Sequence, residues 1–120
     1  MLLSVIRKEK KKVEKIHFVF CSDNFLLSLN KKFLKHGTLT DVITFPASPP
    51  SPLSGEIYIS IPRVKENAKK FNVAFEKELL RAMVHGVLHL CGYKDKTKKQ
   101  KERMRKREDY YIRTFAKMYF

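Results

Sequence analysis

The segment Phe75–Cys91 constrains the fold more than any other part of this chain, because one side of it is continuously apolar. Its large apolar residues recur three and four positions apart, which is the spacing of one face of an α-helix. They are Leu79, Leu80, Met83, Val84, Val87, Leu88, Leu90 and Cys91. A helix with so wide an apolar face belongs in a core, so we predict that the other elements pack around it.

His85 and His89 lie on the opposite side of this predicted helix. Residues four apart on a helix have Cβ atoms about 5–6 Å from each other, so both imidazoles can reach one metal ion. Gly92 can end the helix in a left-handed turn, and the chain can then return Asp95 toward the two rings. Three protein ligands with an open fourth position are typical of a catalytic zinc site.

The alternative is that the two histidines bind no metal. A histidine pair on a helix, taken alone, is more often solvated or packed. Helical phase favours the metal here, because at about 100° per residue His85 and His89 point away from the apolar stripe. Ala82 and Gly86 share their side of the helix, which suits a cleft with close approach of backbone or ligand. Cys91 falls on the apolar stripe, so we do not expect it to be a ligand.

The remaining elements are predicted from shorter segments. β-Branched and aromatic residues favour strands at Glu14–Cys21, Asp41–Pro46 and Gly55–Ile61. Helices are expected from Ser22 to about Phe33, from Pro62 to about Phe71 and over Lys99–Lys117, with a short helix or basic arm over Met1–Lys12 and a loop over 47–54. The predicted fold class is α+β, a small mixed sheet of about three strands with helices packed against it and the metal site on a core helix. We expect a single domain over residues 1–120.

Some side chains are assigned to the core or to a cleft. In the helix after Ser22 the residues predicted to face inward are Phe25, Leu26, Leu29 and Phe33. The last helix carries one mainly apolar side, formed by Met104, Glu108, Tyr111, Ile112 and Phe115. Asp41 and Glu56 are predicted near strand ends, where their carboxylates could border a cleft.

Composition excludes some classes of protein and favours a polyanionic partner. No apolar run approaches the ~18–20 residues that span a bilayer. The N-terminal apolar run is too short, and is followed too soon by charged residues, for a secretory signal. Cys21 and Cys91 have no paired-cysteine motif, so we interpret both as reduced thiols of a cytosolic protein. The net charge of +14 favours nucleic acid, although a plain solvated surface is the alternative. Basic residues are concentrated in Lys94–Arg107.

The run His85-Gly86-Val87-Leu88-His89-Leu90-Cys91-Gly92-Tyr93 is similar to the His-Gly-x-Leu-His-Leu-x-Gly-Tyr signature of the YbeY endoribonuclease family, bacterial ribosomal-RNA maturation factors. The resemblance extends from about Ile16 to Ile112. It includes Leu29-Asn30, Thr40-Asp41-Val42 with Phe45-Pro46, Gly55-Glu56-Ile57, Met104 and Glu108. The central motif is specific enough to imply the family's fold and activity.

This sequence departs from the family's pattern at four places. Asp95 stands where the family usually has a third histidine, and aspartate is also a competent zinc ligand. Leu34 replaces an arginine implicated in RNA handling; Lys35 could substitute as a point charge, without the bidentate fork. Leu39 replaces a proline, and the N-terminal part is shorter than in the family.

The resemblance implies a zinc-dependent endoribonuclease, specific for single strands, acting in 16S rRNA 3′-end maturation and ribosome quality control. One Zn²⁺ per chain would be held by His85, His89 and Asp95, would activate water or polarise a phosphoryl oxygen, and would make these three the catalytic residues. Arg81, Lys94 and Lys35 are the predicted RNA-binding residues. The resemblance also implies a cytoplasmic protein that acts with the small ribosomal subunit and a ribosome-associated GTPase.

Two other functions remain open from the sequence. A non-catalytic ribosome-assembly factor would keep the fold and bind rRNA, and Leu34 in the arginine position favours it slightly. A metal-dependent hydrolase of a non-RNA substrate would keep the metal, although the basic charge argues against it. Because no Glu follows His85, the helix lacks the general base of the His-Glu-x-x-His proteases.

Overall fold

A computed structural model of the chain describes residues 13–33, 41–46 and 53–119. Along the chain the elements are β1 (Val13–Cys21), α2 (Asp23–Phe33), β2 (Val42–Pro46), β3 (Leu53–Ser60), α3 (Ile61–Phe71), α4 (Phe75–Leu90) and α5 (Lys98–Tyr119). Each lies within a few residues of its predicted bounds. The arm predicted over Met1–Lys12, most of the loop predicted over 47–54, and Leu34, Lys35 and Leu39 lie outside the described residues.

The three strands form one mixed sheet in the order β1-β3-β2. β1 runs parallel to β3, and β2 runs antiparallel to it. Pairing places Phe18 opposite Ile57 and Thr44 opposite the same residue, so these three side chains share one face of the sheet. The predicted α+β class with a small mixed sheet is therefore confirmed.

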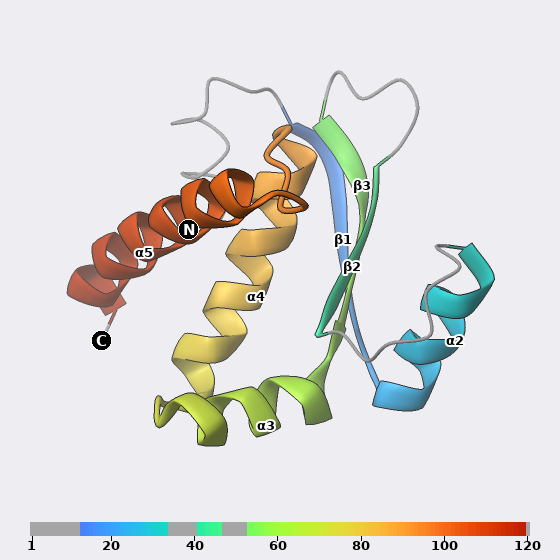
Figure 1. The fold of residues 1–120 in the computed structure, drawn as a ribbon, viewed down its shortest axis with the longest axis horizontal. Helices are drawn as coiled ribbons and strands as arrows, with labels where there is room; N and C mark the ends of the chain where they lie inside the picture. Colours follow the sequence, from blue (N-terminus) through green and yellow to red (C-terminus); the bar gives the residue numbers. More distant parts are fainter. Residues whose placement is uncertain (1–12, 34–40, 47–52, 120) are drawn as a thin grey trace.

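Helix α4 packs on one face of this sheet, with α5 beyond it, while α2 lies on the other side (Figure 1). The core fills the space between α4 and the sheet, where Ile57, Ile59, Val84, Val87 and Leu88 have no exposed surface. Of the apolar stripe predicted for α4, six residues are buried, and Leu79 and Met83 are partly buried against the core. Among the described residues, no helix is long and apolar enough to cross a membrane.

Gly86 sets how closely α4 approaches the sheet. A Cβ built on Gly86 would lie 2.6 Å from Cγ2 of Ile57 on β3, a distance that real Cβ atoms do not adopt. The absence of a side chain at this position therefore lets the helix backbone rest against Ile57. The sequence predicted that backbone or a ligand comes close to the Gly86 side of α4, and in the structure it is the sheet that does so.

Helix α2 meets the sheet with a different set of residues from the one predicted. Leu26 and Asn30 are buried, whereas the Phe25 side chain is 47% exposed, so the inward assignment of Phe25 is wrong. The reason is geometric: Leu26 faces the sheet, and one residue earlier the helix has turned by about 100°. Ser22 does begin the helix as predicted, because its hydroxyl accepts a hydrogen bond from the Phe25 backbone N–H at 3.2 Å.

Helix α5 buries Met104, Glu108, Tyr111 and Ile112 on its predicted inner side, against α4. Three of these four residues are apolar or aromatic, and one is a carboxylate. The two cysteines carry free thiols; Cys91 is buried in the core, and Cys21 is partly exposed. The carboxylate on the inner side of α5 leads directly to the candidate site.

Candidate metal centre

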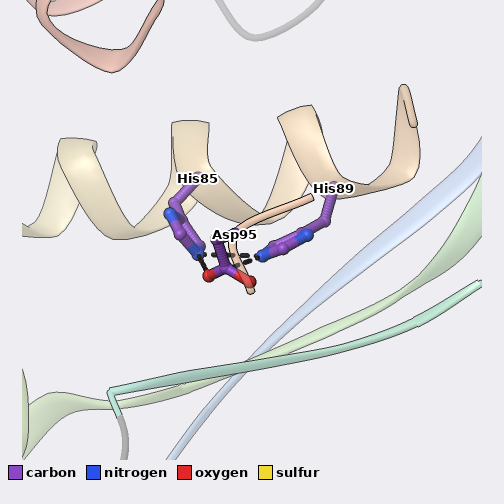
Figure 2. Close-up of side chains that lie close together, drawn as sticks. All are labelled: His85, His89 and Asp95. Atoms are coloured by element: carbon purple, nitrogen blue, oxygen red, sulfur yellow. Dashed lines mark hydrogen bonds and ion pairs between the residues drawn. The ribbon is translucent and has the colours of Figure 1, made fainter. Parts of the chain in front are cut away.

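His85, His89 and Asp95 converge on one point beside α4 (Figure 2). The Nε2 atoms of His85 and His89 lie 3.0 Å apart. Oδ2 of Asp95 lies 3.3 Å from each Nε2 atom. In a tetrahedral site with zinc-to-ligand distances of about 2.0–2.1 Å, two ligand atoms are separated by about 3.3 Å, so this triangle fits such an ion. The structure brings together the three residues that the sequence predicted.

The local chain path explains how Asp95 reaches the two rings. α4 ends at Leu90, and Gly92 adopts φ +107°, a conformation that favours glycine. Two backbone bonds secure the turn, from Gly92 N–H to the His89 carbonyl and from Tyr93 N–H to the Leu88 carbonyl, each 3.0 Å long. This turn reverses the chain after the helix, and Asp95 follows three residues later.

The other ring nitrogen of each histidine is held by an oxygen atom. Nδ1 of His85 lies 2.5 Å from Oε2 of Glu108, and Nδ1 of His89 lies 3.0 Å from the carbonyl oxygen of Tyr93. Both acceptors favour the tautomer in which Nδ1 carries the proton. Nε2 of each ring then presents a lone pair toward the other ring and toward Asp95, which is the arrangement of metal-binding histidines.

Glu108 is the site residue whose role the sequence interpretation missed. The sequence places Glu108 on the inner side of the last helix and within the family resemblance, but indicates no function for it. The available signal was an acidic residue among apolar ones on that side, with Met104, Tyr111 and Ile112. A buried carboxylate needs a partner. Here the partners are His85 and the guanidinium of Arg81, which donates to Glu108 Oε1 at 3.0 Å.

The two imidazoles have opposite electrostatic environments. Burial lowers the pKa of His85, but the hydrogen bond and charge of Glu108, together with Asp95, outweigh burial, so the pKa is raised. The pKa of His89 is lowered, first by burial and then by the neighbouring His85. The pKa of His89 therefore favours its neutral form, in which a ring nitrogen is free to act as a ligand.

The residues predicted to bind RNA have different surroundings. Arg81 is half-buried, and its guanidinium also pairs with Asp109 at 2.7 Å, so Glu108 and Asp109 on α5 hold it in place. Lys94 is exposed on the turn between α4 and α5, directly before Asp95. Lys35 lies outside the described residues. RNA binding by all three stays a prediction.

A cavity of about 320 Å³ opens beside the convergent residues. Its lining comes from α3, α4, α5, the turn between α4 and α5, and the residue before β2. The lining residues are Asp41, Asn67, Phe71, Glu78, Arg81, Ala82, His85, Asp95, Lys101, Met104, Arg105 and Glu108. Asp41 borders this cavity as predicted, but Glu56 does not. Glu56 alternates with Ile57, which faces α4, so the Glu56 side chain points to the other face of the sheet.

The fold and these contacts define a class: a small α+β protein with a histidine–carboxylate site, suited to a metal ion, on a core helix. The comparisons with known proteins agree. The family model for endoribonuclease YbeY matches residues 2–116. The chain therefore belongs to the YbeY family, as its sequence motif implied.

Individual relatives give the degree of similarity. The chain is 52% identical to endoribonuclease YbeY of Flavobacterium psychrophilum, over 93% of this chain and 80% of the relative. It is 50% identical to endoribonuclease YbeY of Amoebophilus asiaticus, over 91% of this chain and 75% of the relative. The fold is similar to the solution structure of a Thermotoga maritima protein, with a TM-score of 0.65 and 36% identity over 92% of this chain and 73% of that one.

Proposed function

We propose that this protein is a metal-dependent endoribonuclease that cleaves single-stranded RNA, with one Zn²⁺ per chain held by His85, His89 and Asp95. The observation that carries this proposal is the pair of fixed tautomers: Glu108 and the Tyr93 carbonyl bind the Nδ1 atoms, and both Nε2 atoms face Asp95. The relatives described above are also named endoribonucleases, which supports RNA as the substrate.

The donor set fits zinc in kind as well as in geometry, because neutral imidazole and carboxylate are both common zinc ligands. When bound, such a cation supplies Lewis acidity, which lowers the pKa of water and offsets negative charge on a phosphoryl oxygen. The protein's part is to orient the ligands. Glu108 holds His85, and Arg81 together with Met104 and Tyr111 in the packing of α5 keeps Glu108 in place.

RNA binding is proposed for the basic groups around the cavity. Lys94 precedes Asp95 and is exposed, so it can reach a phosphate next to the metal. Arg81 contributes positive charge to the cavity while its guanidinium remains held by Glu108 and Asp109. Lys35 is proposed as a further phosphate contact in place of the family arginine. The cellular role proposed is 16S rRNA 3′-end maturation and ribosome quality control in the cytoplasm, with the small ribosomal subunit and a ribosome-associated GTPase as partners.

The test combines metal content with RNA cleavage. Rigorously purified protein is expected to contain about one zinc per chain by elemental analysis, and to cut a single-stranded RNA but not its duplex. His89→Ala is expected to lose both metal and cleavage. His17→Ala is the matched control, because His17 is an exposed histidine on β1 away from the site. Both variants are expected to keep the circular dichroism of the parent.

Three results would contradict the proposal in different ways. Cleavage that persists in His89→Ala would mean that the metal site does not perform the reaction. Salt-sensitive RNA binding without metal-dependent turnover would identify a non-catalytic assembly factor instead. Hydrolysis of a peptide or small ester, with RNA untouched, would identify a hydrolase of another substrate.

A further inference from the structure

Glu78 is a buried acid whose role in the candidate metal centre is not explained. Its side chain lines the cavity described above, two helical turns before His85 on the same side of α4. Only 6% of the residue surface is exposed. Its carboxylate accepts no hydrogen bond from the described part of the chain, although Arg81 lies close enough to influence its charge. Because no described protein group donates to it, the carboxylate on the cavity wall can accept hydrogen bonds from a ligand that supplies donors.

The electrostatics of Glu78 are dominated by its burial. Burial raises the pKa of this carboxyl group, and the charge of Arg81, which lowers the pKa, does not offset burial. Asp41 raises the pKa further. Donor groups supplied by a ligand would stabilise the charged form, because hydrogen bonds to a carboxylate favour it.

The rest of the cavity has the features of a nucleotide site. Phe71 on α3 lines the cavity with its side chain 51% exposed, which offers an aromatic face at the rim. Asn67, also on α3, adds an amide that can both donate and accept. Lys101 and Arg105 on α5 contribute positive charge. Single-stranded RNA is recognised by this combination: unstacked bases lie on aromatic side chains and are read at their edges, while cations hold the phosphates.

We propose that this cavity binds an unstacked guanine base of single-stranded RNA, with the Glu78 carboxylate accepting hydrogen bonds from the N1–H and N2–H groups of guanine. This inference rests on the proposed function for its biological setting, since it names a base next to the cleavage site. The same cavity is lined by His85 and Asp95, so a base held at Glu78 leaves an adjoining phosphate beside the candidate metal centre.

Guanine is preferred over the other bases for a chemical reason. A carboxylate has two acceptor oxygens and no donor. Guanine presents two adjacent donors on its Watson–Crick edge, whereas adenine and cytosine each present one donor beside an acceptor. Uracil presents a single donor between two acceptors. Only guanine therefore satisfies both oxygens of Glu78 without placing an acceptor against a carboxylate.

The experiment measures binding of the four ribonucleoside 5′-monophosphates to the purified full chain by isothermal titration calorimetry. None of them contains an internal phosphodiester bond, so cleavage does not interfere. GMP is expected to bind about tenfold more tightly than AMP, CMP or UMP, which is the size of one well-placed pair of hydrogen bonds. Phe71→Ala is expected to weaken all four nucleotides, because a stacking face has little base preference.

Glu78→Gln tests the carboxylate itself. The amide offers one acceptor and one donor, so the preference for GMP is expected to disappear. Glu76→Gln is the matched control, because Glu76 is an exposed acid on the same helix, and it is expected to keep the preference. If Glu78→Gln does not fold, the ranking of the four nucleotides by the parent protein still decides. Equal binding of all four, tightest binding of AMP, or an unchanged GMP preference in Glu78→Gln would overturn the inference.

The outcomes also separate this inference from the proposed function. Metal-dependent RNA cleavage without any guanine preference would contradict the guanine site and leave the endoribonuclease proposal intact. A GMP preference that depends on Glu78, in a protein that cleaves no RNA, would support the guanine site and contradict the proposed endoribonuclease activity.

Discussion

Glu108 on α5 binds the Nδ1 atom of His85 on α4, and this single contact links the last helix of the chain to the candidate metal centre. The contact lies on the buried side of α5, where Glu108 is only 4% exposed. Because the carboxylate fixes the ring orientation of His85, the packing of α5 against α4 determines where Nε2 points. The candidate site is therefore built by two helices and a turn, although its three convergent side chains come from a stretch of eleven residues.

Glu108→Gln is expected to weaken metal binding without removing a ligand. The amide keeps the volume of the side chain but loses the negative charge, and it cannot accept from both His85 and Arg81 as the carboxylate does. We expect zinc affinity to fall about 10- to 100-fold, the usual effect of removing such a partner. Competition with a chromogenic chelator measures this. Asp109→Asn is the control, since Asp109 contacts Arg81 but not His85; equal affinities in the two variants would contradict the role of Glu108.

Asp95→His is expected to keep the metal, whereas Asp95→Ala is expected to lose it. Oδ2 of Asp95 lies 3.3 Å from both Nε2 atoms, so its removal leaves two protein ligands. Histidine, the usual family residue at this position, restores a third ligand while removing one negative charge. After dialysis against chelator-free buffer, elemental analysis is expected to give about one zinc per chain for Asp95→His and close to none for Asp95→Ala. Full metal content in Asp95→Ala would show that this carboxylate is not a ligand.

The sequence was sufficient to predict the parts of the site that follow from local geometry. The spacing of His85 and His89, their phase relative to the apolar stripe, and the left-handed turn at Gly92 are properties of one contiguous segment. The structure brings Asp95 to these two rings as predicted. The strands and helices were also predictable, because their periodicity is local.

What the sequence did not predict depends on contacts between distant segments. Glu108 and His85 are 23 positions apart in the sequence, and nothing in the α5 sequence identifies which neighbour the Glu108 carboxylate contacts. The burial of Glu78 depends on α3 and α5 as well as on α4, so the spacing of residues along α4 does not predict it. Phe25 was placed inward from hydrophobicity alone, whereas the position of the sheet decides which side of α2 is covered. Tertiary packing decides such cases.

Acid is expected to weaken the junction between α2 and α3. The Ser60 hydroxyl donates to Asp23 at 2.5 Å and Arg63 donates at 2.9 Å. These contacts, the Ser60 bond first, lower the pKa of Asp23 despite some burial. Because the folded-state pKa lies below the unfolded value of about 3.9, the contribution to stability is complete above pH about 5 and is lost as the pH falls through the folded-state pKa.

Asp23→Asn is therefore expected to lower the free energy of unfolding by about 1 kcal/mol at pH 7, a modest value because the side chains of Asp23 and Arg63 are partly exposed. The difference from the parent is expected to shrink as the pH falls below about 4. Urea unfolding at pH 7, 5 and 3 measures it. Glu66→Gln, at an exposed acid on α3, is the control and should change little. A difference that stays constant down to pH 3 would argue against the lowered pKa.

Gly86→Ala is expected to destabilise the fold through a steric contact with β3. The new Cβ would lie 2.6 Å from Cγ2 and 3.0 Å from Cδ1 of Ile57, so the helix or the strand must shift. Overpacking of this kind costs about 1–3 kcal/mol, and the better helix propensity of alanine offsets about 1 kcal/mol. We expect the free energy of unfolding in urea to fall by up to about 2 kcal/mol.

Measuring Gly86→Ala in two Ile57 variants tests whether contact with Ile57 causes the loss of stability. Ile57→Ala removes all three atoms that the new Cβ would meet, so adding Gly86→Ala to it is expected to be neutral or slightly stabilising. Ile57→Val keeps the nearest methyl group, so the cost of Gly86→Ala should persist there. If Gly86→Ala costs the same in all three backgrounds, the close approach of α4 to Ile57 is not what requires a glycine, and the position of the histidine face relative to the sheet has another determinant.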